Sequence, residues 1–161
     1  AVLEGGFLVH GAIDLVERHA TTGEARVTDV KTGTNFSHPS LIIDGGEVLQ
    51  PVLYGLAYEA VWKEKVADAS LSFCTTRGGH AEHVITLDEA ARKEGFVVLE
   101  LIDDAIDKGF FPASPREGAC EPCGYRLVCG PHEERRAARK DESTLADGAL
   151  FGRLRLLRGR P

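Results

Sequence analysis

A helical pattern over residues 47–64, set between strand-like segments, constrains the fold more than any other feature of the sequence. Apolar side chains recur there at three- and four-residue spacing, which places them on one face of an α-helix. They are Leu49, Val52, Leu53, Leu56, Ala60 and Val61. Pro51 is compatible with this helix only near its first turn, where few amide groups have helical partners. We therefore expect a helix over residues 47–64, with Pro51 near its first turn.

The segments around this helix predict strands, because they contain β-branched and aromatic residues and are separated by turn residues. Strands are expected over residues 7–17, 26–32, 69–76 and 81–87, with a turn at 20–25 and a loop over 37–46. Asp88 is expected to cap a second helix that ends near Lys108, before Gly109, and a basic helix is expected over 132–140. This order of elements predicts a mixed α/β domain.

The sequence "RGGH", residues 77–80, separates the last two predicted strands. It lacks both the G-x-x-x-x-G-K-[ST] pattern and the following helix of a phosphate-binding loop. We interpret it as a glycine turn.

Charge divides the chain into an acidic body and a basic end. The net charge of −6 argues against a passive nucleic-acid coat protein, yet residues 132–161 carry eight basic and five acidic side chains. The first 131 residues carry 11 basic and 20 acidic ones. This asymmetry suits an enzyme that holds metal ions on carboxylates and meets a polyanion elsewhere, although a solvated terminal helix is the commoner explanation.

No apolar run approaches the ~20 residues that a membrane span requires, and the first residues lack the features of a signal peptide. We therefore expect a cytoplasmic protein without a membrane partner. The chain begins at Ala1 and enters a strand-like segment almost at once, from which we expect a domain of a longer protein.

The stretch "VTDVKTG", residues 27–33, places Asp29 and Lys31 on the same face of a strand. A structural ion pair and half of an active site both explain these two residues. Asp14, on the preceding predicted strand, can lie about 5 Å away across an antiparallel pair. Two buried aspartates and a lysine are unfavourable unless paired, and Mg²⁺ on one or two carboxylates resolves the conflict. Lys31 would then orient or deprotonate an attacking water molecule.

Gln50 and Tyr54 lie one turn apart on one face of the predicted helix. An amide and a phenol on a shared face suit contacts to a phosphate backbone or a base. For these two residues alone, a capping glutamine and an amphipathic tyrosine at the edge of the core are the simpler explanation.

Three stretches, "GAIDLVE", "VTDVKTG" and "LQPVLYGLAYE", together resemble the successive motifs of RecB-type nucleases in the PD-(D/E)XK superfamily. The resemblance covers residues from about 9 to 60, with the motifs in order. Each motif is weak by itself, whereas all three at this spacing form a strong signal. The resemblance implies a restriction-endonuclease-like fold, in which helices flank a mixed β-sheet.

The resemblance also implies roles for individual residues. Mg²⁺ or Mn²⁺ would be bound by Asp14, Asp29 and the backbone carbonyl of Val30, and Lys31 would be catalytic. Gln50 and Tyr54 would position DNA, expected as single strands or duplex ends, with a helicase domain or subunit as a partner. Residues 1–115 are expected to form the nuclease core, and residues 116–161 a cysteine-bearing loop and basic helical tail of the same domain.

The chain departs from the family pattern at its start. Such nucleases often carry an upstream His or Glu on a preceding helix, which completes the metal site, and no such helix is predicted before Phe7. His10 lies in a different position, on the strand that carries Asp14, and we interpret it as structural. The N-terminal helix of the fold is therefore expected to be missing from this chain.

Cys120, Cys123 and Cys129 give the spacing C-x2-C-x5-C, which in a reducing compartment indicates a metal site more often than disulfides. The spacing alone permits zinc or iron–sulfur. It resembles the triplet of iron–sulfur nucleases, namely AddB subunits and CRISPR-associated exonucleases, in which a fourth cysteine far upstream completes a [4Fe–4S] cluster. Cys74 is predicted to be a buried thiol within a strand. We expect the cluster in the full-length protein, and zinc or no metal in this chain alone.

Two functions follow from these observations. The first is a metal-dependent DNA nuclease of repair and recombination, expected to act as an exonuclease. The alternative is a catalytically inactive, nuclease-like module that binds DNA or serves as a scaffold, which the missing upstream ligand motivates. A structural zinc domain would explain the cysteines but not the three ordered motifs.

Overall fold

The computed structural model describes residues 1–35, 41–115 and 117–161, and within these ranges the chain forms two compact units. The first unit consists of residues 1–99 together with 158–161, and the second of residues 100–157. The predicted loop over 37–46 lies partly outside the described residues. The expected boundary at residue 115 stays a prediction.

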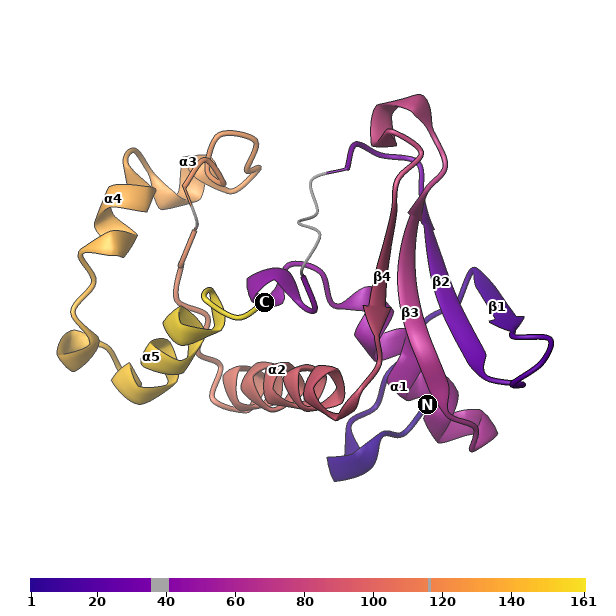
Figure 1. Ribbon diagram of the computed structural model, residues 1–161. Coiled ribbons are helices and arrows are strands. Elements are labelled where there is room, and N and C mark those ends of the chain that lie inside the picture. The colour runs from indigo at the N-terminus through magenta and orange to yellow at the C-terminus, as the bar shows by residue number, and fades with distance from the viewer. Residues whose placement is uncertain (36–40, 116) are drawn as a thin grey trace. The chain divides into compact units, whose positions relative to one another are not determined.

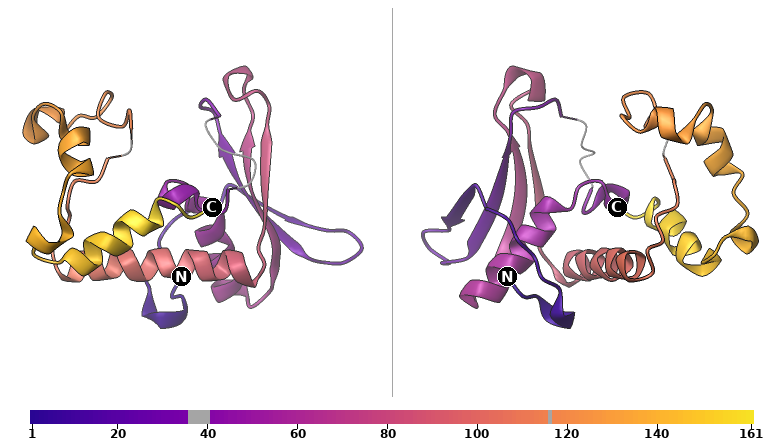
Figure 2. Two further views of the ribbon diagram at one scale, coloured as in Figure 1. Left: turned by 60° about the vertical axis from the view of Figure 1, so that its left-hand side comes forward. Right: turned by 180° about the vertical axis from the view of Figure 1, so that it is seen from behind.

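A four-stranded mixed sheet forms the centre of the first unit (Figure 1). Its strands, in spatial order, are β1 (Leu15–Arg18), β2 (Ala25–Lys31), β3 (Val66–Phe73) and β4 (Glu82–Thr86). β2 and β3 are parallel, whereas β1 and β4 run antiparallel to their neighbours. A parallel pair needs a long crossover, and helix α1 (Gln50–Trp62) supplies it on one face of the sheet (Figure 2). The predicted mixed α/β class is confirmed, and the arrangement is consistent with a restriction-endonuclease-like fold.

The first strand is shorter than predicted. The sequence predicts a strand over 7–17, but β1 begins at Leu15, and Asp14 lies in a bend directly before it. Gly5 and Gly6 have positive φ values of 80° and 85° and turn the chain, so that Val9 N donates a hydrogen bond to Ala1 O. The amides of Leu3, Gly6 and Val9 thus donate hydrogen bonds within residues 1–9 and not to β2.

Helix α1 begins at Gln50, three residues later than predicted, and Pro51 lies in its first turn as expected. Val52 and Leu56 are buried in the first unit, and Gly95 of α2 (Glu89–Asp107) packs against them. A Cβ atom on Gly95 would lie 2.7 Å from Val52 Cγ1, so only glycine permits this approach of the two helices without a shift.

The predicted ends of the second helix are confirmed. Asp88 Oδ1 accepts a hydrogen bond of 2.8 Å from Ala91 N, which is the geometry of an N-terminal cap. At the other end, Gly109 adopts a left-handed conformation with φ 57°, just after the helix stops.

In addition to the last turns of α2, the described part of the second unit contains α3 (Arg126–Cys129), α4 (Glu133–Ala138) and α5 (Gly148–Leu157). α4 corresponds to the predicted basic helix over 132–140, and α5 follows it without a predicted counterpart. Leu150 and Phe151 of α5 are buried, and Leu150 forms an apolar core with Leu101 and Ala105. No helix among the described residues is long and apolar enough to cross a membrane.

Candidate active site

Strand β2 carries the D-x-K motif in the interior of the sheet, between β1 and β3. Asp29 is only 5 % exposed, whereas Lys31, at the end of the strand, is partly exposed. Lys31 Nζ lies 2.6 Å from Asp29 Oδ2. The two side chains therefore share one face of β2 and form an ion pair.

One carboxylate oxygen of Asp29 lacks a hydrogen bond. Oδ2 is buried and accepts none from the described residues, so its contact with Lys31 is an ion pair without hydrogen-bond geometry. A buried carboxylate with an unsatisfied oxygen is unfavourable unless a cation supplies the missing interaction. Asp29 thus retains an oxygen that a further cation can use.

Asp14 reaches the same strand through its side chain. The pairing of β1 with β2 begins at Leu15, opposite Thr28. One residue earlier, Asp14 Oδ2 accepts a hydrogen bond of 2.8 Å from Val30 N. The carboxylate therefore contacts the backbone between Asp29 and Lys31, although it comes from the bend before β1 and not from within a strand.

Two side chains of α1 extend this group. Lys31 Nζ donates a hydrogen bond to Gln50 Oε1, and Gln50 Nε2 donates one of 3.3 Å to Tyr54 Oη. Gly11 lies against the tyrosine ring, because a Cβ atom there would be 3.4 Å from Tyr54 Cε1. We call Asp14, Asp29, Lys31, Gln50 and Tyr54 the site network. Lys31 contacts Asp29 and Gln50, and Gln50 contacts Tyr54. Asp14 binds the backbone at Val30, between Asp29 and Lys31.

Comparison with known protein families identifies the chain. The profile of the PD-(D/E)XK nuclease superfamily matches residues 2–130, which contain the whole site network. The chain belongs to this superfamily. Membership implies metal-dependent hydrolysis of phosphodiesters, with a nucleic acid as substrate. None of the curated proteins and none of the solved structures compared with the chain matches it.

The site network fits the divalent metal ion that superfamily membership implies. Among the described residues, no three His, Cys, Asp or Glu side chains gather into a ready-made metal site. Asp14 and Asp29 nevertheless suit Mg²⁺, which takes one or two carboxylates and fills its other positions with water and phosphate oxygens. The unsatisfied Oδ2 of Asp29 offers a ligand atom, and the Val30 carbonyl stays a predicted further ligand.

Sequence reasoning missed an ion pair that supports the site. Glu59 of α1 accepts hydrogen bonds from Arg92 of α2 at 2.6 and 3.1 Å, and from Val66 N at the start of β3 at 2.8 Å. Burial raises the pKa of Glu59, but the hydrogen bonds from Arg92 and Val66 outweigh it, so that the pKa is lowered overall. These contacts join α1, α2 and β3, and partners 33 residues apart leave no local signal in the sequence.

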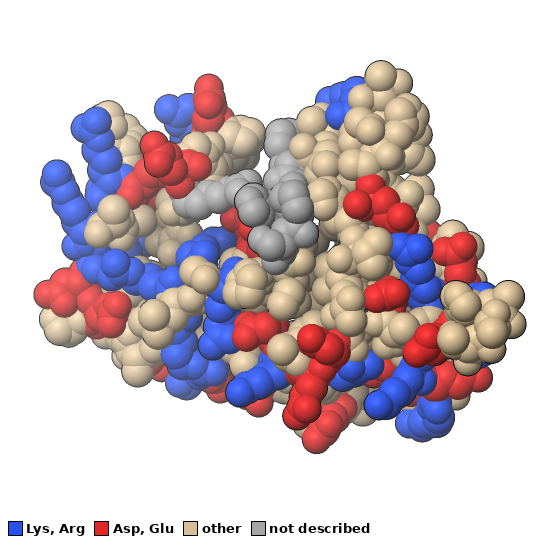
Figure 3. Space-filling view, viewed as in Figure 1, with Lys and Arg blue, Asp and Glu red and all other residues tan. Residues whose placement is uncertain are grey.

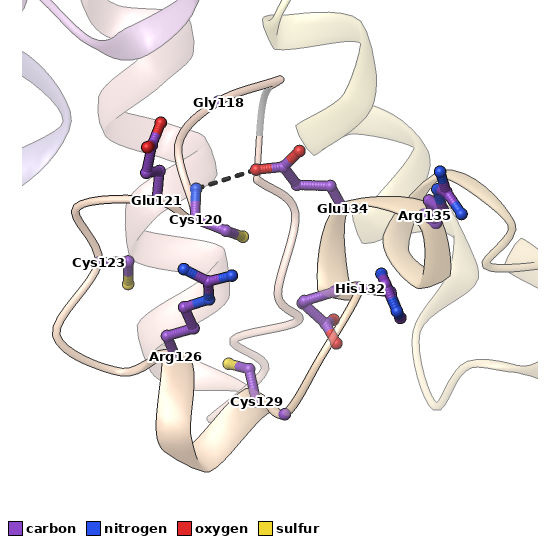
Figure 4. Close-up of a pocket in the computed structure, with 11 residues that line it drawn as sticks. Gly118, Cys120, Glu121, Cys123, Arg126, Cys129, His132, Glu134 and Arg135 are labelled. Carbon is purple, nitrogen blue, oxygen red and sulfur yellow. Dashed lines mark hydrogen bonds between the residues drawn. The ribbon is translucent and has the colours of Figure 1, made fainter.

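The three cysteines of the triplet line one cavity of about 360 Å³ in the second unit (Figure 4). None of them forms a disulfide; Cys120 and Cys129 are partly buried, and Cys123 is exposed. Glu134 Oε1 accepts a hydrogen bond of 3.1 Å from Cys120 N. Burial, followed by the negative charge of Glu134, raises the pKa of the Cys120 thiol and favours its protonated form.

The cysteine triplet by itself does not fit a complete [4Fe–4S] site, which requires four thiolates. Cys74 follows β3 in the first unit and is exposed, so the prediction of a buried thiol within a strand is wrong. β3 ends at Phe73, and just beyond it Cys74 N still donates a hydrogen bond of 3.0 Å to Lys31 O before the chain turns. Within the described residues, the cysteines form no complete metal site.

Proposed function

We propose that the chain is a metal-dependent DNA nuclease of the RecB/AddB type. The observation that carries this proposal is the site network, in which Lys31 joins the buried Asp29 to Gln50 while Asp14 binds the backbone at Val30. Exonucleolytic action on single strands or duplex ends, a role in DNA repair and recombination, a helicase domain or subunit as partner, and a cytoplasmic location belong to the same proposal. The three ordered motifs support it.

Each residue of the site network has a defined part in this proposal. Asp14, Asp29 and the Val30 carbonyl would hold Mg²⁺ or Mn²⁺. The bound ion would lower the pKa of a water molecule and neutralise charge on the scissile phosphate. Lys31, fixed between Asp29 and Gln50, orients the attacking water and offsets the negative charge that develops on the phosphate. Gln50 and Tyr54 position the DNA.

Within this proposal, Cys120, Cys123 and Cys129 form part of a metal clasp. Their C-x2-C-x5-C spacing and their shared cavity support this role. In the full-length protein, a fourth cysteine would complete a [4Fe–4S] cluster, whereas this chain alone would hold zinc or no metal at the triplet.

Cleavage assays test the proposal. We expect the purified protein to degrade end-labelled single-stranded or duplex DNA with Mg²⁺ or Mn²⁺, and to be inactive in EDTA. Asp29→Ala and Lys31→Ala are each expected to slow cleavage by about 100-fold or more, as for the loss of one preorganised electrostatic group. Glu17→Ala removes an exposed acid from β1 and should leave the rate unchanged. Wild-type rates in both site variants, with folding confirmed by circular dichroism, would refute the assignment.

One observation favours the alternative of a module that does not cut DNA. The described residues supply two carboxylates to the site network and no third metal-binding side chain close by. An inactive module would bind DNA without metal-dependent cleavage by the wild-type protein. The same assays therefore separate the two functions.

A further inference from the structure

The turn between β3 and β4, residues 74–81, is attached to the chain segment that follows Lys31. In the parallel pair, Lys31 lies opposite Phe73, so the segments that leave the two strands run side by side. Cys74 N donates a hydrogen bond of 3.0 Å to Lys31 O, and Thr75 Oγ1 donates one of 3.1 Å to Thr32 O. The turn is therefore held at the C-terminal ends of β2 and β3, next to Lys31 of the site network.

Close packing and internal hydrogen bonds fix the conformation of this turn. A Cβ atom on Gly78 would lie 3.1 Å from Gly33 O, so the turn approaches the segment after Lys31 at backbone distance. The amides of Gly78, Gly79 and His80 all donate to Thr75 or Thr76. Because these three amides are used internally, they do not form the anion-binding cradle of a phosphate loop, and a ligand would contact the side chains of the turn.

Arg77 is the basic side chain that this turn presents. It is exposed, and it is the one arginine in the described part of the first unit without a carboxylate partner. The other arginines of that unit all form ion pairs: Arg18, Arg26, Arg92, Arg158 and Arg160. Figure 3 shows basic atoms at the tip of this turn with uncharged residues around them. The guanidinium is thus available to an external anion.

We propose that Arg77 contacts a backbone phosphate of the DNA strand bound at the site network. This inference rests on the proposed nuclease function. Four residues of chain and one spacing between β-strands separate Arg77 from Lys31, so their Cα atoms are at most about 19 Å apart. A stretch of DNA a few nucleotides long spans this distance. A guanidinium binds phosphate oxygens in a bidentate manner, and such a contact fixes the strand without reading its sequence.

The salt dependence of DNA binding tests this contact. Dissociation constants are measured for a labelled single-stranded oligonucleotide in EDTA, where cleavage does not occur, between 50 and 200 mM NaCl. Arg77→Ala should bind more weakly, and its slope of log affinity against log salt should be shallower by about 0.7, as for one lost phosphate contact. The ratio of variant to wild-type dissociation constants should therefore shrink by about threefold over this range. Arg77→Lys should retain most of the wild-type slope.

Lys65→Ala is the matched control, since Lys65 is an exposed basic residue at the opposite end of β3. It should leave the slope unchanged. An unaltered slope in Arg77→Ala, or an equal change in Lys65→Ala, overturns the contact. If the wild-type protein binds and cleaves DNA and Arg77→Ala has the same slope of log affinity against log salt, the Arg77 contact is wrong and the nuclease proposal stands. If the wild-type protein neither binds nor cleaves DNA, the nuclease proposal fails with it.

Discussion

At the scale of a single residue, Asp29 links the stability of the first unit to its proposed chemistry. Its carboxylate is buried; among the described residues, its Oδ2 atom accepts no hydrogen bond and has one cationic partner, Lys31. A buried charge whose contact to its counter-ion lacks hydrogen-bond geometry is partly uncompensated. A cation bound at Asp29 should therefore stabilise the folded state.

We expect MgCl₂ to raise the unfolding temperature of the wild-type protein and to have little effect on Asp29→Asn. A ligand that binds only the folded state adds about 2.7 kcal/mol to the free energy of unfolding at a concentration 100 times its dissociation constant. Thermal unfolding over a series of MgCl₂ concentrations measures this stabilisation without any assay of activity. Glu17→Gln serves as the control and should respond like the wild type. An equal shift in Asp29→Asn would show that the ion binds elsewhere.

At the scale of elements, the Glu59–Arg92 pair holds α1 against α2 and the start of β3. Since the pKa of Glu59 is lowered in the folded state, its contribution to stability is fully present above its ordinary value of 4.5. That contribution is lost as the pH falls through the lower, folded-state pKa.

Glu59→Gln should therefore be less stable than the wild type at pH 7, and this difference should shrink below pH 4.5. Trp62, the single tryptophan, lies near the end of α1 and stacks on Tyr58, with 4.8 Å between the ring centroids. Its fluorescence therefore reports unfolding of the first unit. Urea unfolding at both pH values gives the two differences. A constant difference across the pH range would contradict the assigned role of the ionised carboxylate.

The elements that sequence analysis predicted well are those whose signal is local. The apolar spacing and Pro51 define α1, and Asp88 and Gly109 mark the ends of the second helix. The first strand was overestimated because hydrogen bonds within residues 1–9 compete with pairing to β2. α5 was missed because Gly148 and Gly152 weaken its helical signal, although Leu150 is buried.

For the site, the order and spacing of three motifs were sufficient to nominate the residues of the site network, and the structure brings them together. Their contacts required the tertiary structure. The hydrogen bond from Lys31 to Gln50 depends on where α1 crosses the sheet. Among the described residues of the first unit, which arginines form ion pairs with carboxylates, and which one is left without such a partner, depends on contacts between residues that are distant in sequence. Neither is encoded in a local pattern.

At the scale of the whole molecule, the first unit is built from two distant parts of the chain. Residues 158–161 return to it after the second unit. Ile43 N donates a hydrogen bond of 2.8 Å to Pro161 O, and Gly45 N donates one of 3.0 Å to Arg160 O. Arg160 Nη1 also contacts both carboxylate oxygens of Glu94, at 2.7 and 2.8 Å. These four residues are therefore expected to stabilise the unit that carries the site network.

Deletion of residues 158–161 should lower the free energy of unfolding of the first unit by about 2–3 kcal/mol, from two backbone hydrogen bonds and partly exposed ion pairs. Arg160→Ala removes only the pair with Glu94 and should cost at most about 1 kcal/mol. Trp62 fluorescence during urea unfolding measures the loss of stability in each variant. The deletion should also reduce DNA cleavage as the temperature rises, because the site network unfolds together with the first unit. If the deletion costs no more than Arg160→Ala, the backbone contacts at Ile43 and Gly45 do not contribute, and the first unit is stable without the returning segment.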